Sequence, residues 1–357
     1  MPIRLIFEPG KVVTWKEFKQ YSPLSIAIDG YCKSGPRYSR SRRVLNINHH
    51  EGVERLAVRS SCDQALVLVK MGLYETFRDD QGRPSAMLYC NDCDQDVCFT
   101  TFVLQHPDWI DRPALKRLIR IEDLMDTSGG LFPVKKRWHN VRQLAWITAP
   151  YDEVRRSGEL MKLDAVGMRR LVAQVHKRIA QTIFGRVKEI TLDTRYEVMH
   201  QSTCWTMVRE LGGQARIAMV EDGVRAFISF LGENEGRYRY VIGRLSHFVP
   251  FPIYDIFVAL NEADGISAWD QDRWGGSDSI GGSPRERLSQ LSPEEVVKVV
   301  EDVLRRKGDC LCPEHQPGYV SPEAPPNDEP PASEVASDPA DPPGDPADPP
   351  GDPAAKP

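Results

Sequence analysis

The chain has 357 residues, with 46 basic and 51 acidic side chains and a formal net charge of −5. The charge is uneven: residues 321–357 hold nine carboxylates and one lysine, so they carry −8 and residues 1–320 carry +3. No apolar run approaches the roughly 18 residues needed to cross a bilayer, and the amino terminus lacks the apolar stretch of a signal peptide. We therefore expect a cytoplasmic protein with no membrane partner, whose eight cysteines are reduced thiols.

Residues 1–160 alternate short β-rich runs with helical ones. The expected strands are Arg4–Phe7, Ser25–Gly30, Val44–His50 and Ala86–Asp92. Each is apolar on both faces and ends in polar residues, as is typical of buried parallel strands. A helix is expected over Ser60–Phe77, because serines that can cap a helix precede an apolar run. This alternation predicts an α/β domain with a doubly wound parallel sheet, in which ligands bind at the carboxyl ends of the strands.

The second half is expected to contain a smaller mixed α/β domain over residues 211–308. Apolar residues recur at helical spacing from Leu163 to Phe184, so residues 161–210 are predicted to form a connecting helix and a linker. The Asp222-Gly223 pair lies between two alternating runs, which predicts a β-hairpin over Ala215–Gly232. The other expected elements are a strand over Tyr238–Val249, a helix over Ile253–Ala263, and a helix capped by Ser292 that runs to Arg306.

Residues 309–357 have the composition of a disordered tail. The sequence DPADPPG runs twice between Asp338 and Gly351. Proline removes backbone donors and repeated aspartate repels itself, so no packed core is expected there. A solubilising extension is the favoured interpretation, and a ligand for a proline-recognition partner protein is the alternative. Cys310, Cys312 and His315 have zinc-like spacing without an evident fourth ligand, so a frayed helix end is favoured over a zinc site.

Acids and histidines follow three consecutive predicted strands. Asp29 ends one strand, His49 and His50 end the next, and the segment NDCDQD supplies Asp92, Asp94 and Asp96. Converging carboxylates and imidazoles suit Mn²⁺, Fe²⁺ or Zn²⁺, and such an ion activates water and neutralises a phosphoryl oxygen. The alternative is a set of solvated loop residues. An EF-hand is discarded, because its required sixth-position glycine is replaced by Val97.

The segment VLNINHHEG, followed by VRSSCDQALVLV, resembles the DHH phosphoesterase superfamily. That resemblance implies a metal-dependent phosphoesterase, for which we expect manganese as the divalent ion, with a carboxyl-terminal substrate domain that carries a glycine-rich motif. LYCNDCDQD or EDLMDTSGG resembles the segment with the later metal-binding aspartate. On this basis His49, His50 and Asp92 are predicted as catalytic residues, and Asp29, His50, Asp92, Asp94 and Asp126 as metal ligands.

The chain departs from the family pattern in two places. Asn48 stands where the family has a metal-binding aspartate, and an amide is a poorer ligand for a hard cation than a carboxylate. The family's earliest motif has no counterpart in the segment RLIFEPGKVVTW. A site for one ion, or no ion at all, is therefore expected in place of a complete two-metal site. Asp123 and Asp126 lie one helical turn apart, a spacing that ordinary amphipathic helices also show.

Two further segments are predicted to bind substrate phosphate. The first is the basic segment Cys32–Arg43, and the second is the glycine-rich segment WGGSDSIGGSPR, whose backbone amides and Arg285 suit an anion. The predicted binding residues are Arg37, Arg40, Arg42, Arg43, Gly275, Gly276, Ser277, Gly281, Gly282, Ser283 and Arg285. Solvated surface loops are the alternative for both. Trp274 is expected either to stack on a base or to anchor the loop.

Two function classes remain open from the sequence. The leading hypothesis is a metal-dependent phosphoesterase that acts on a phosphodiester or phosphoanhydride, with short oligonucleotides or nucleotides as substrates. The alternative is a non-catalytic nucleotide- or nucleic-acid-binding module built on the same fold, which Asn48 and the missing first motif favour. In both cases the partner is a phosphate-bearing small molecule or a short nucleic acid.

Overall fold

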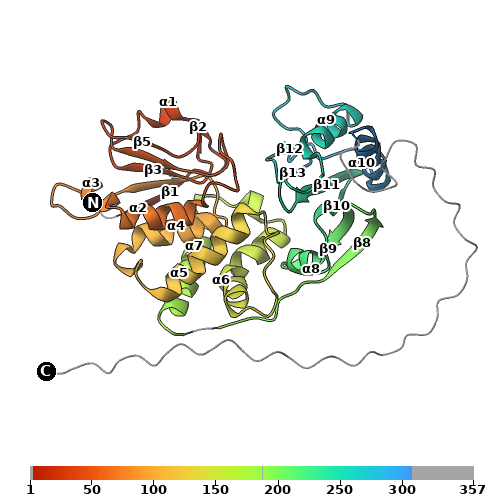
Figure 1. The fold of residues 1–357 in the computed structure, drawn as a ribbon. Helices are drawn as coiled ribbons and strands as arrows, with labels where there is room; N and C mark the ends of the chain where they lie inside the picture. The colour runs from red at the N-terminus through yellow and green to blue at the C-terminus, as the bar shows by residue number, and fades with distance from the viewer. Residues whose placement is uncertain (1–2, 187, 308–357) are drawn as a thin grey trace, which may run out of the picture. The chain divides into compact units, whose positions relative to one another are not determined.

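The computed structural model describes residues 3–186 and 188–307, all of which belong to one compact unit. The predicted disordered tail and the zinc-like Cys310, Cys312 and His315 lie outside the described residues. No helix within the described part is both long and apolar enough to cross a bilayer. The structure confirms a mixed α/β fold with two main sheets, shown in Figure 1.

The first sheet has five strands in the order β1-β7-β3-β6-β5. The strands are β1 (Arg4–Phe7), β3 (Ser25–Ile28), β5 (Arg37–Ser39), β6 (Val44–Ile47) and β7 (Met87–Cys90). The first four in this order run parallel, and β5 pairs antiparallel with β6. The four predicted strands are confirmed. Parallel pairing places the carboxyl ends of β1, β7, β3 and β6 along one edge of the sheet.

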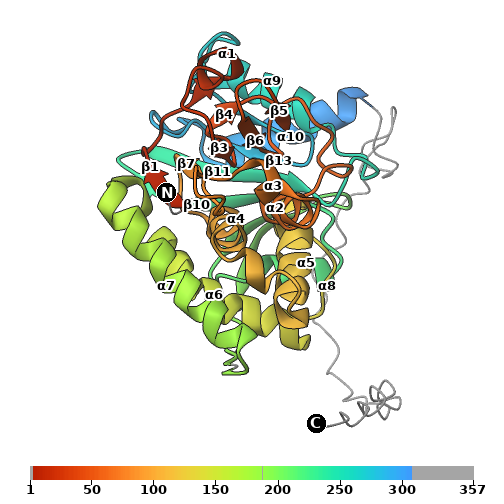
Figure 2. The same cartoon turned by 90° about the vertical axis from the view of Figure 1, so that its left-hand side faces the viewer.

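Helices cover one face of this sheet, below the strands in Figure 1 and again in the side view of Figure 2. They are α2 (Ser61–Lys70), α3 (Leu73–Thr76), α4 (Gln95–Gln105), α5 (Pro113–Thr127), α6 (His139–Arg156) and α7 (Ala165–Ile183), with 3-10 turns at Pro107–Trp109 and Leu160–Lys162. Ile26, Ile28 and Leu88 point from the strands into the core beneath these helices. The predicted helix in the 60–77 segment begins where Ser60 accepts a hydrogen bond from the Asp63 amide.

The opposite face of the first sheet carries a small aromatic cluster. Ala27 and Val44 alternate with the residues of the other face and pack against Phe18 and Tyr31. The covering segment holds the four-residue helix α1 (Trp15–Phe18) and the short strands β2 (Val13–Thr14) and β4 (Cys32–Lys33). Because α1 is the only helix in this cluster of described residues, the finer prediction of a doubly wound sheet, with full helices on both faces, is not confirmed.

The second sheet has six strands in the order β12-β13-β11-β10-β9-β8. They are β8 (Tyr196–Gln201), β9 (Thr206–Glu210), β10 (Ala226–Asn234), β11 (Arg237–Arg244), β12 (Gly275–Gly276) and β13 (Ile280–Gly282). One face packs on α9 (Ile253–Ala263) and α10 (Pro293–Lys307), and the other on α8 (Ala215–Glu221). Both predicted carboxyl-terminal helices are confirmed. Ser292 caps α10 through the Glu295 amide.

The hairpin predicted over Ala215–Gly232 is wrong. Residues 215–221 form α8, which buries Ala215, Ile217 and Met219. Gly223 has a φ of +90°, and its amide donates to the Val220 carbonyl while the Val224 amide donates to Met219. The Asp-Gly pair therefore ends a helix, a role that the same left-handed glycine fills as readily as a hairpin turn. The hairpin of this region joins β10 to β11 through Glu235 and Gly236, both with positive φ.

The segment predicted as a connecting helix and linker, residues 161–210, holds α7 and the strands β8 and β9. The helix α7 is the predicted amphipathic helix, and it packs against α6 and β1 in the core of the first sheet. The second sheet already begins at Tyr196, within the segment expected to be a linker. The exact division of the chain into domains stays a prediction.

Candidate metal centre

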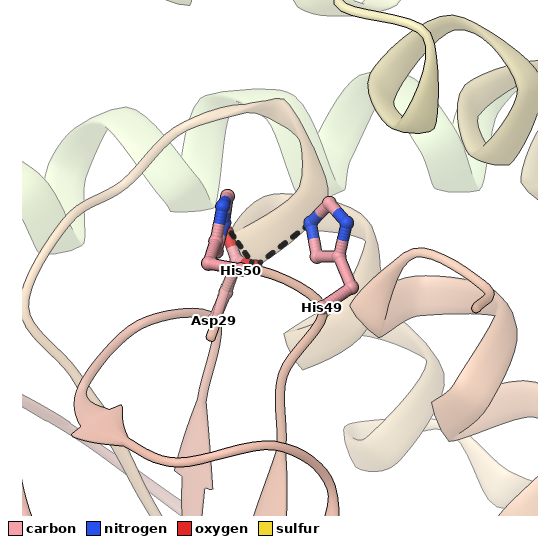
Figure 3. A group of neighbouring side chains, drawn as sticks. All are labelled: Asp29, His49 and His50. Atoms are coloured by element: carbon pink, nitrogen blue, oxygen red, sulfur yellow. Dashed lines mark ion pairs between the residues drawn. The ribbon is translucent and has the colours of Figure 1, made fainter. Parts of the chain in front are cut away.

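The carboxyl ends of β3 and β6 bring an aspartate and two histidines together. Ile28 and Ile47 are partners in the parallel register, and the Asp29 amide donates to the Ile47 carbonyl at 2.9 Å. Asp29 has a φ of +46°, so the chain turns sharply as it leaves β3. As Figure 3 shows, the side chains of Asp29, His49 and His50 then face one another. The sequence argument from converging strand ends predicted this meeting.

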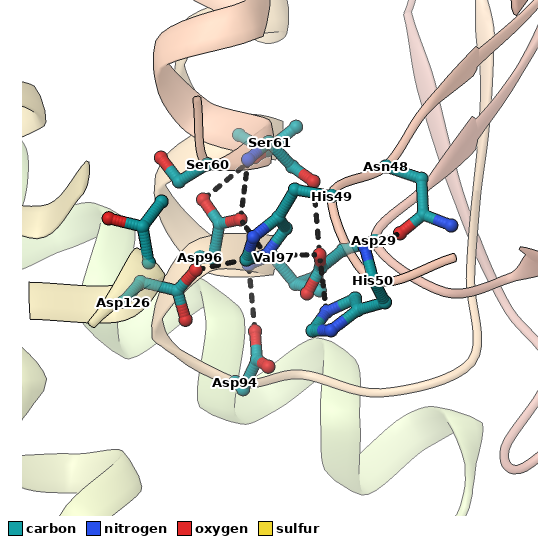
Figure 4. Close-up of polar contacts among 12 residues, drawn as sticks. Asp29, Asn48, His49, His50, Ser60, Ser61, Asp94, Asp96, Val97 and Asp126 are labelled. Atoms are coloured by element: carbon teal, nitrogen blue, oxygen red, sulfur yellow. Dashed lines mark hydrogen bonds and ion pairs between the residues drawn. The ribbon is translucent and has the colours of Figure 1, made fainter. Parts of the chain in front are cut away.

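His49 is fully buried and is surrounded by three carboxylates. Its Nε2 atom lies 3.2 Å from Asp29 Oδ1, 3.5 Å from Asp96 Oδ2 and 2.9 Å from Asp126 Oδ2. Asp96 comes from the first turn of α4 and Asp126 from the last turn of α5, so three separate elements supply the group (Figure 4). These two acids are far from His49 in sequence, and only the packing of the helices brings them to it.

Two of these buried atoms lack hydrogen bonds. Neither His49 Nε2 nor Asp126 Oδ2 has a hydrogen-bond partner, although they lie 2.9 Å apart, because their orientation does not suit a direct bond. An unsatisfied buried polar atom is costly, and most such atoms in proteins bind a water or an ion. The residues form two groups that share His49, namely Asp29–His49–His50 and His49–Asp96–Asp126, and the ligand atoms of each group lie within 4.8 Å of one another. The buried group His49–Asp96–Asp126 therefore fits a single divalent cation.

Backbone amides at the start of α2 hold the Asp96 carboxylate. Its two oxygens accept hydrogen bonds from the amides of Ser61 and Cys62, both at 2.7 Å. The Ser61 hydroxyl donates to Asp29 Oδ1 at 3.0 Å. Such outer contacts orient metal ligands. Asp96 was part of the predicted acidic segment but not of the predicted ligand set, and its place in the first turn of α4, just after a strand end, is the sequence signal that could have identified it.

His50 differs from His49 in exposure. Its Nε2 atom lies 3.0 Å from Asp29 Oδ1, but 38 % of its side chain is exposed. Asp29 therefore contacts both histidines through one oxygen, as the dashed lines in Figure 3 show. His50 belongs to the rim of the cluster, where a solvent-borne ligand can reach it.

The cluster has a strongly negative potential. Burial alone lowers the pKa of His49, but the charges of Asp126 and Asp29 raise it to about 11. Burial and the charges of Asp29 and Asp126 raise the pKa of Asp96 to about 8. Burial also raises the pKa of Asp29, but the two histidines outweigh it and hold that pKa well below its usual value. Several carboxylates packed around His49 repel one another, and a bound cation would relieve this repulsion.

Asn48 is turned away from the cluster by its own hydrogen bonds. Its amide nitrogen donates to the carbonyls of Cys32 at 3.2 Å and Ser34 at 2.9 Å, and its oxygen accepts from the His50 amide at 3.0 Å. The residue is fully buried. Asn48 thus fastens the β4 segment to the histidine turn, and its oxygen is already occupied.

Asp92 and Asp94 lie near the cluster without a direct contact to either histidine. Asp94 caps α4 by accepting a hydrogen bond from the Val97 amide, and Asp92 accepts one from the Cys93 amide. Burial, with the charge of Asp29 added, raises the pKa of both. The structure therefore gives Asp94 a capping role, and it places neither acid among the groups that converge on His49.

The predicted arginine site is not formed at this edge of the sheet. Register pairs Arg37 with Asn46 and Ser39 with Val44, so residues 40–43 form the turn at the amino end of β6. Arg42 donates to the Lys19 carbonyl there, and the guanidinium of Arg37 lies over the Trp15 ring. His49 follows the other end of β6, roughly 13 Å away for a four-residue strand. The expectation that Arg40, Arg42 and Arg43 overhang the histidines is wrong, because β5 is an antiparallel partner of β6.

The glycine-rich segment forms a hairpin rather than an anion nest. The Ser277 amide donates to the Ile280 carbonyl, and the amides of Ser279 and Ile280 donate to the Ser277 hydroxyl, so these donors are already used. Gly276 and Gly281 are required by close backbone contact: a Cβ on Gly276 would lie 2.3 Å from the Gly281 Cα. The predicted residues Gly275 and Gly282 pair in the same hairpin.

Other residues of this segment also have structural roles. Ser283 is buried and bonds the Tyr240 backbone through both its amide and its hydroxyl. Trp274 is buried and its indole donates to Asp264 at 2.8 Å, so it anchors the loop and does not present a stacking surface. Arg285 is exposed, and its charge acts on Asp92 together with that of Arg155. Of the predicted phosphate-binding residues in this segment, Arg285 stays available to a ligand, whereas the Ser277 hydroxyl already donates to the Ile280 carbonyl.

Comparison with known proteins gives no family for this chain: no protein-family model, curated protein or solved structure matches it.

Proposed function

We propose that this protein is a metal-dependent phosphoesterase that hydrolyses a phosphodiester or phosphoanhydride. The observation that carries the proposal is the buried Nε2 atom of His49, which has three carboxylate oxygens within 3.5 Å and no hydrogen bond of its own. His49, Asp96 and Asp126 are the residues that would hold the ion, and Asp29 contacts His49 beside them. One imidazole and two carboxylates suit Mn²⁺, Fe²⁺ or Zn²⁺, of which manganese is the proposed cofactor.

A divalent ion supplies a Lewis acid that polarises a phosphoryl oxygen and increases the acidity of water. In the hydrolysis, the water oxygen forms a new bond to phosphorus while the bond from phosphorus to the leaving oxygen breaks. The electron pair of the broken bond stays on the leaving oxygen, which takes up a proton, and the attacking water releases one. These proton transfers need a group at the rim of the buried cluster.

His50 is the residue best placed to move these protons. Its Nε2 atom pairs with Asp29, which fixes the orientation of the ring and leaves Nδ1 to exchange a proton with the reactants. Its partial exposure gives access to substrate, which the fully buried His49 lacks. We assign His50 the role of acid–base catalyst and His49 that of ligand. We propose that Asp92 is not a catalytic residue and that it contributes negative charge beside Asp29 and Asp94.

The direct test measures bound metal and hydrolysis in the same preparations. We expect about one Mn, Fe or Zn ion per chain by elemental analysis, and manganese-dependent hydrolysis of bis(p-nitrophenyl) phosphate and short oligonucleotides. Asp126→Asn should lower metal affinity at least tenfold, whereas the exposed Asp108→Asn is the matched control. His50→Ala should keep the ion and lose most of the activity. A wild-type chain that takes up none of the three metals would contradict the proposal.

A second candidate is a nucleotide- or nucleic-acid-binding module without catalysis. The specific observation in its favour is Asn48, whose amide is occupied by Cys32, Ser34 and His50 and adds no charge to the cluster. A protein that binds a nucleotide but hydrolyses no phosphoester with any of the three metals would support this module. A phosphate-bearing small molecule or short nucleic acid is the proposed partner in either case.

A further inference from the structure

A buried arginine lies beside the candidate metal centre. Arg55 belongs to the loop between β6 and α2, and only 7 % of it is exposed. One terminal nitrogen of its guanidinium donates to the Asp126 carbonyl at 3.1 Å. Its Nε atom is buried and has no hydrogen-bond partner. A buried guanidinium with an unused donor is costly unless an anion or another acceptor completes its hydrogen bonds.

Arg55 also lines a cleft of about 360 Å³. The polar and charged side chains that line this cleft belong to His50, Glu54, Arg55, Tyr254, Ser277 and Asp278. Its volume is in the range of small-molecule sites. The cleft therefore places Arg55 beside His50, the proposed acid–base residue, and Ser277 of the glycine-rich hairpin lines the same cleft.

The charges of the cleft differ in their exposure. Glu54 is an acid at the rim, with 57 % of its side chain exposed, and it faces His247 at 3.8 Å. Asp278 is partly exposed. Water screens such charges strongly, whereas the charge of a buried guanidinium acts through a medium of lower dielectric constant. Among the residues that line the cleft, Arg55 is consequently the buried charge, and the two carboxylates stand at the opening.

We propose that Arg55 is the phosphate-binding residue of this site, and that it holds a non-bridging oxygen of the substrate beside His50. A guanidinium recognises phosphate oxygens through paired N–H donors, which the free Nε of Arg55 can complete. This inference rests on the proposed function for the identity of the anion. It gives Arg55 the role that the sequence suggested for the arginines of residues 37–43.

The test uses the full-length chain as purified and inorganic phosphate as the probe, with binding measured by calorimetry. Arg55→Met keeps an unbranched side chain but removes its charge and its donors, and should weaken phosphate binding roughly 10–100-fold. Arg55→Lys should give an intermediate loss, because it restores charge without the paired donors. The matched control is Arg59→Met, since Arg59 lies on the same loop, is exposed and pairs with Asp63.

Two measurements separate anion binding from a structural role. Because Arg55 also bonds the Asp126 carbonyl, metal content is measured in each variant, and Arg55→Met should keep its ion. In the wild type, the Nε–H resonance of Arg55 should shift during phosphate titration, a readout that needs no substitution. Unchanged affinity in Arg55→Met, or an unmoved Arg55 resonance at phosphate saturation, would overturn the inference.

Failure of the inference and failure of the proposed function give different results. Arg55-dependent phosphate binding in a chain that hydrolyses no phosphoester supports the subsite and contradicts the phosphoesterase. Metal-dependent hydrolysis that is equally fast in Arg55→Met and in wild type supports the phosphoesterase and contradicts the subsite.

Discussion

Asn48→Asp is expected to destabilise the protein, although it would restore the carboxylate that the resembled family has at this position. The amide nitrogen of Asn48 donates to two carbonyl oxygens in the wild type. A carboxylate has no donor, so it would place a negative oxygen against both carbonyls in a fully buried position. The hydrogen bond from the His50 amide can persist, because a carboxylate also accepts.

The magnitude follows from these contacts. Two lost hydrogen bonds cost about 1 kcal/mol each, and the unsatisfied buried acceptors add about 1–3 kcal/mol, so the free energy of unfolding should fall by about 3–5 kcal/mol. This corresponds to a fall in melting temperature of about 5–8 °C for a unit of about 300 residues.

Thermal and denaturant unfolding of the metal-free proteins at pH 7 measures this change. Asn234→Asp is the control, because Asn234 is exposed at the end of β10 and its substitution should change stability by less than about 0.5 kcal/mol. An Asn48→Asp protein as stable as wild type would refute the structural role of the amide. An increase in bound metal in that variant would show that the side chain can turn toward the cluster.

Three other substitutions test separate parts of the structure. Gly129→Ala should lower the free energy of unfolding by about 1–3 kcal/mol, because Gly129 has a φ of +62° and an added Cβ would lie 2.7 Å from Ile280. Gly82→Ala is the control, because Gly82 has a φ of +76° but open space around it, so its substitution measures the backbone contribution alone. Equal losses of stability in the two variants, measured by denaturant unfolding, would contradict the packing contact. His176→Gln should remove a pH-dependent loss of stability of at most about 3 kcal/mol, because burial lowers the pKa of His176 to about 4 while the unfolded residue titrates near 6.5. The stability that the neutral histidine contributes is complete above pH 6.5 and is lost as the pH falls toward 4. The free energy of unfolding should therefore change less between pH 7 and pH 4.5 in the variant than in wild type. An equal change in the two proteins would refute the role of His176. Replacing Arg40, Arg42 and Arg43 together with alanine should leave kcat/KM for phosphoester hydrolysis within about threefold, because the turn lies at the opposite end of β6 from His49; a tenfold loss would show that these arginines reach the substrate.

The local sequence determined most of the secondary structure and half of the candidate site. Strands β1, β3, β6 and β7 are short apolar runs that end in polar residues, and this pattern is sufficient to locate them. Parallel neighbours place their carboxyl ends together, so the meeting of Asp29 with His49 and His50 follows from strand order alone. The Asp222-Gly223 pair was ambiguous, because helix ends and hairpins use the same left-handed glycine.

The tertiary structure decided how the cluster is completed: it brings the predicted ligand Asp126 to His49 and adds Asp96. Asp96 and Asp126 reach His49 because α4 and α5 pack beside α2, and the depth of each acid depends on that packing rather than on local pattern. The direction of β5 moved the arginine turn away from the histidines, since an antiparallel partner reverses which end of a segment faces the site. Burial then distinguished Arg55 from the other arginines of the chain, and burial is a property of the folded core that no single stretch of sequence contains.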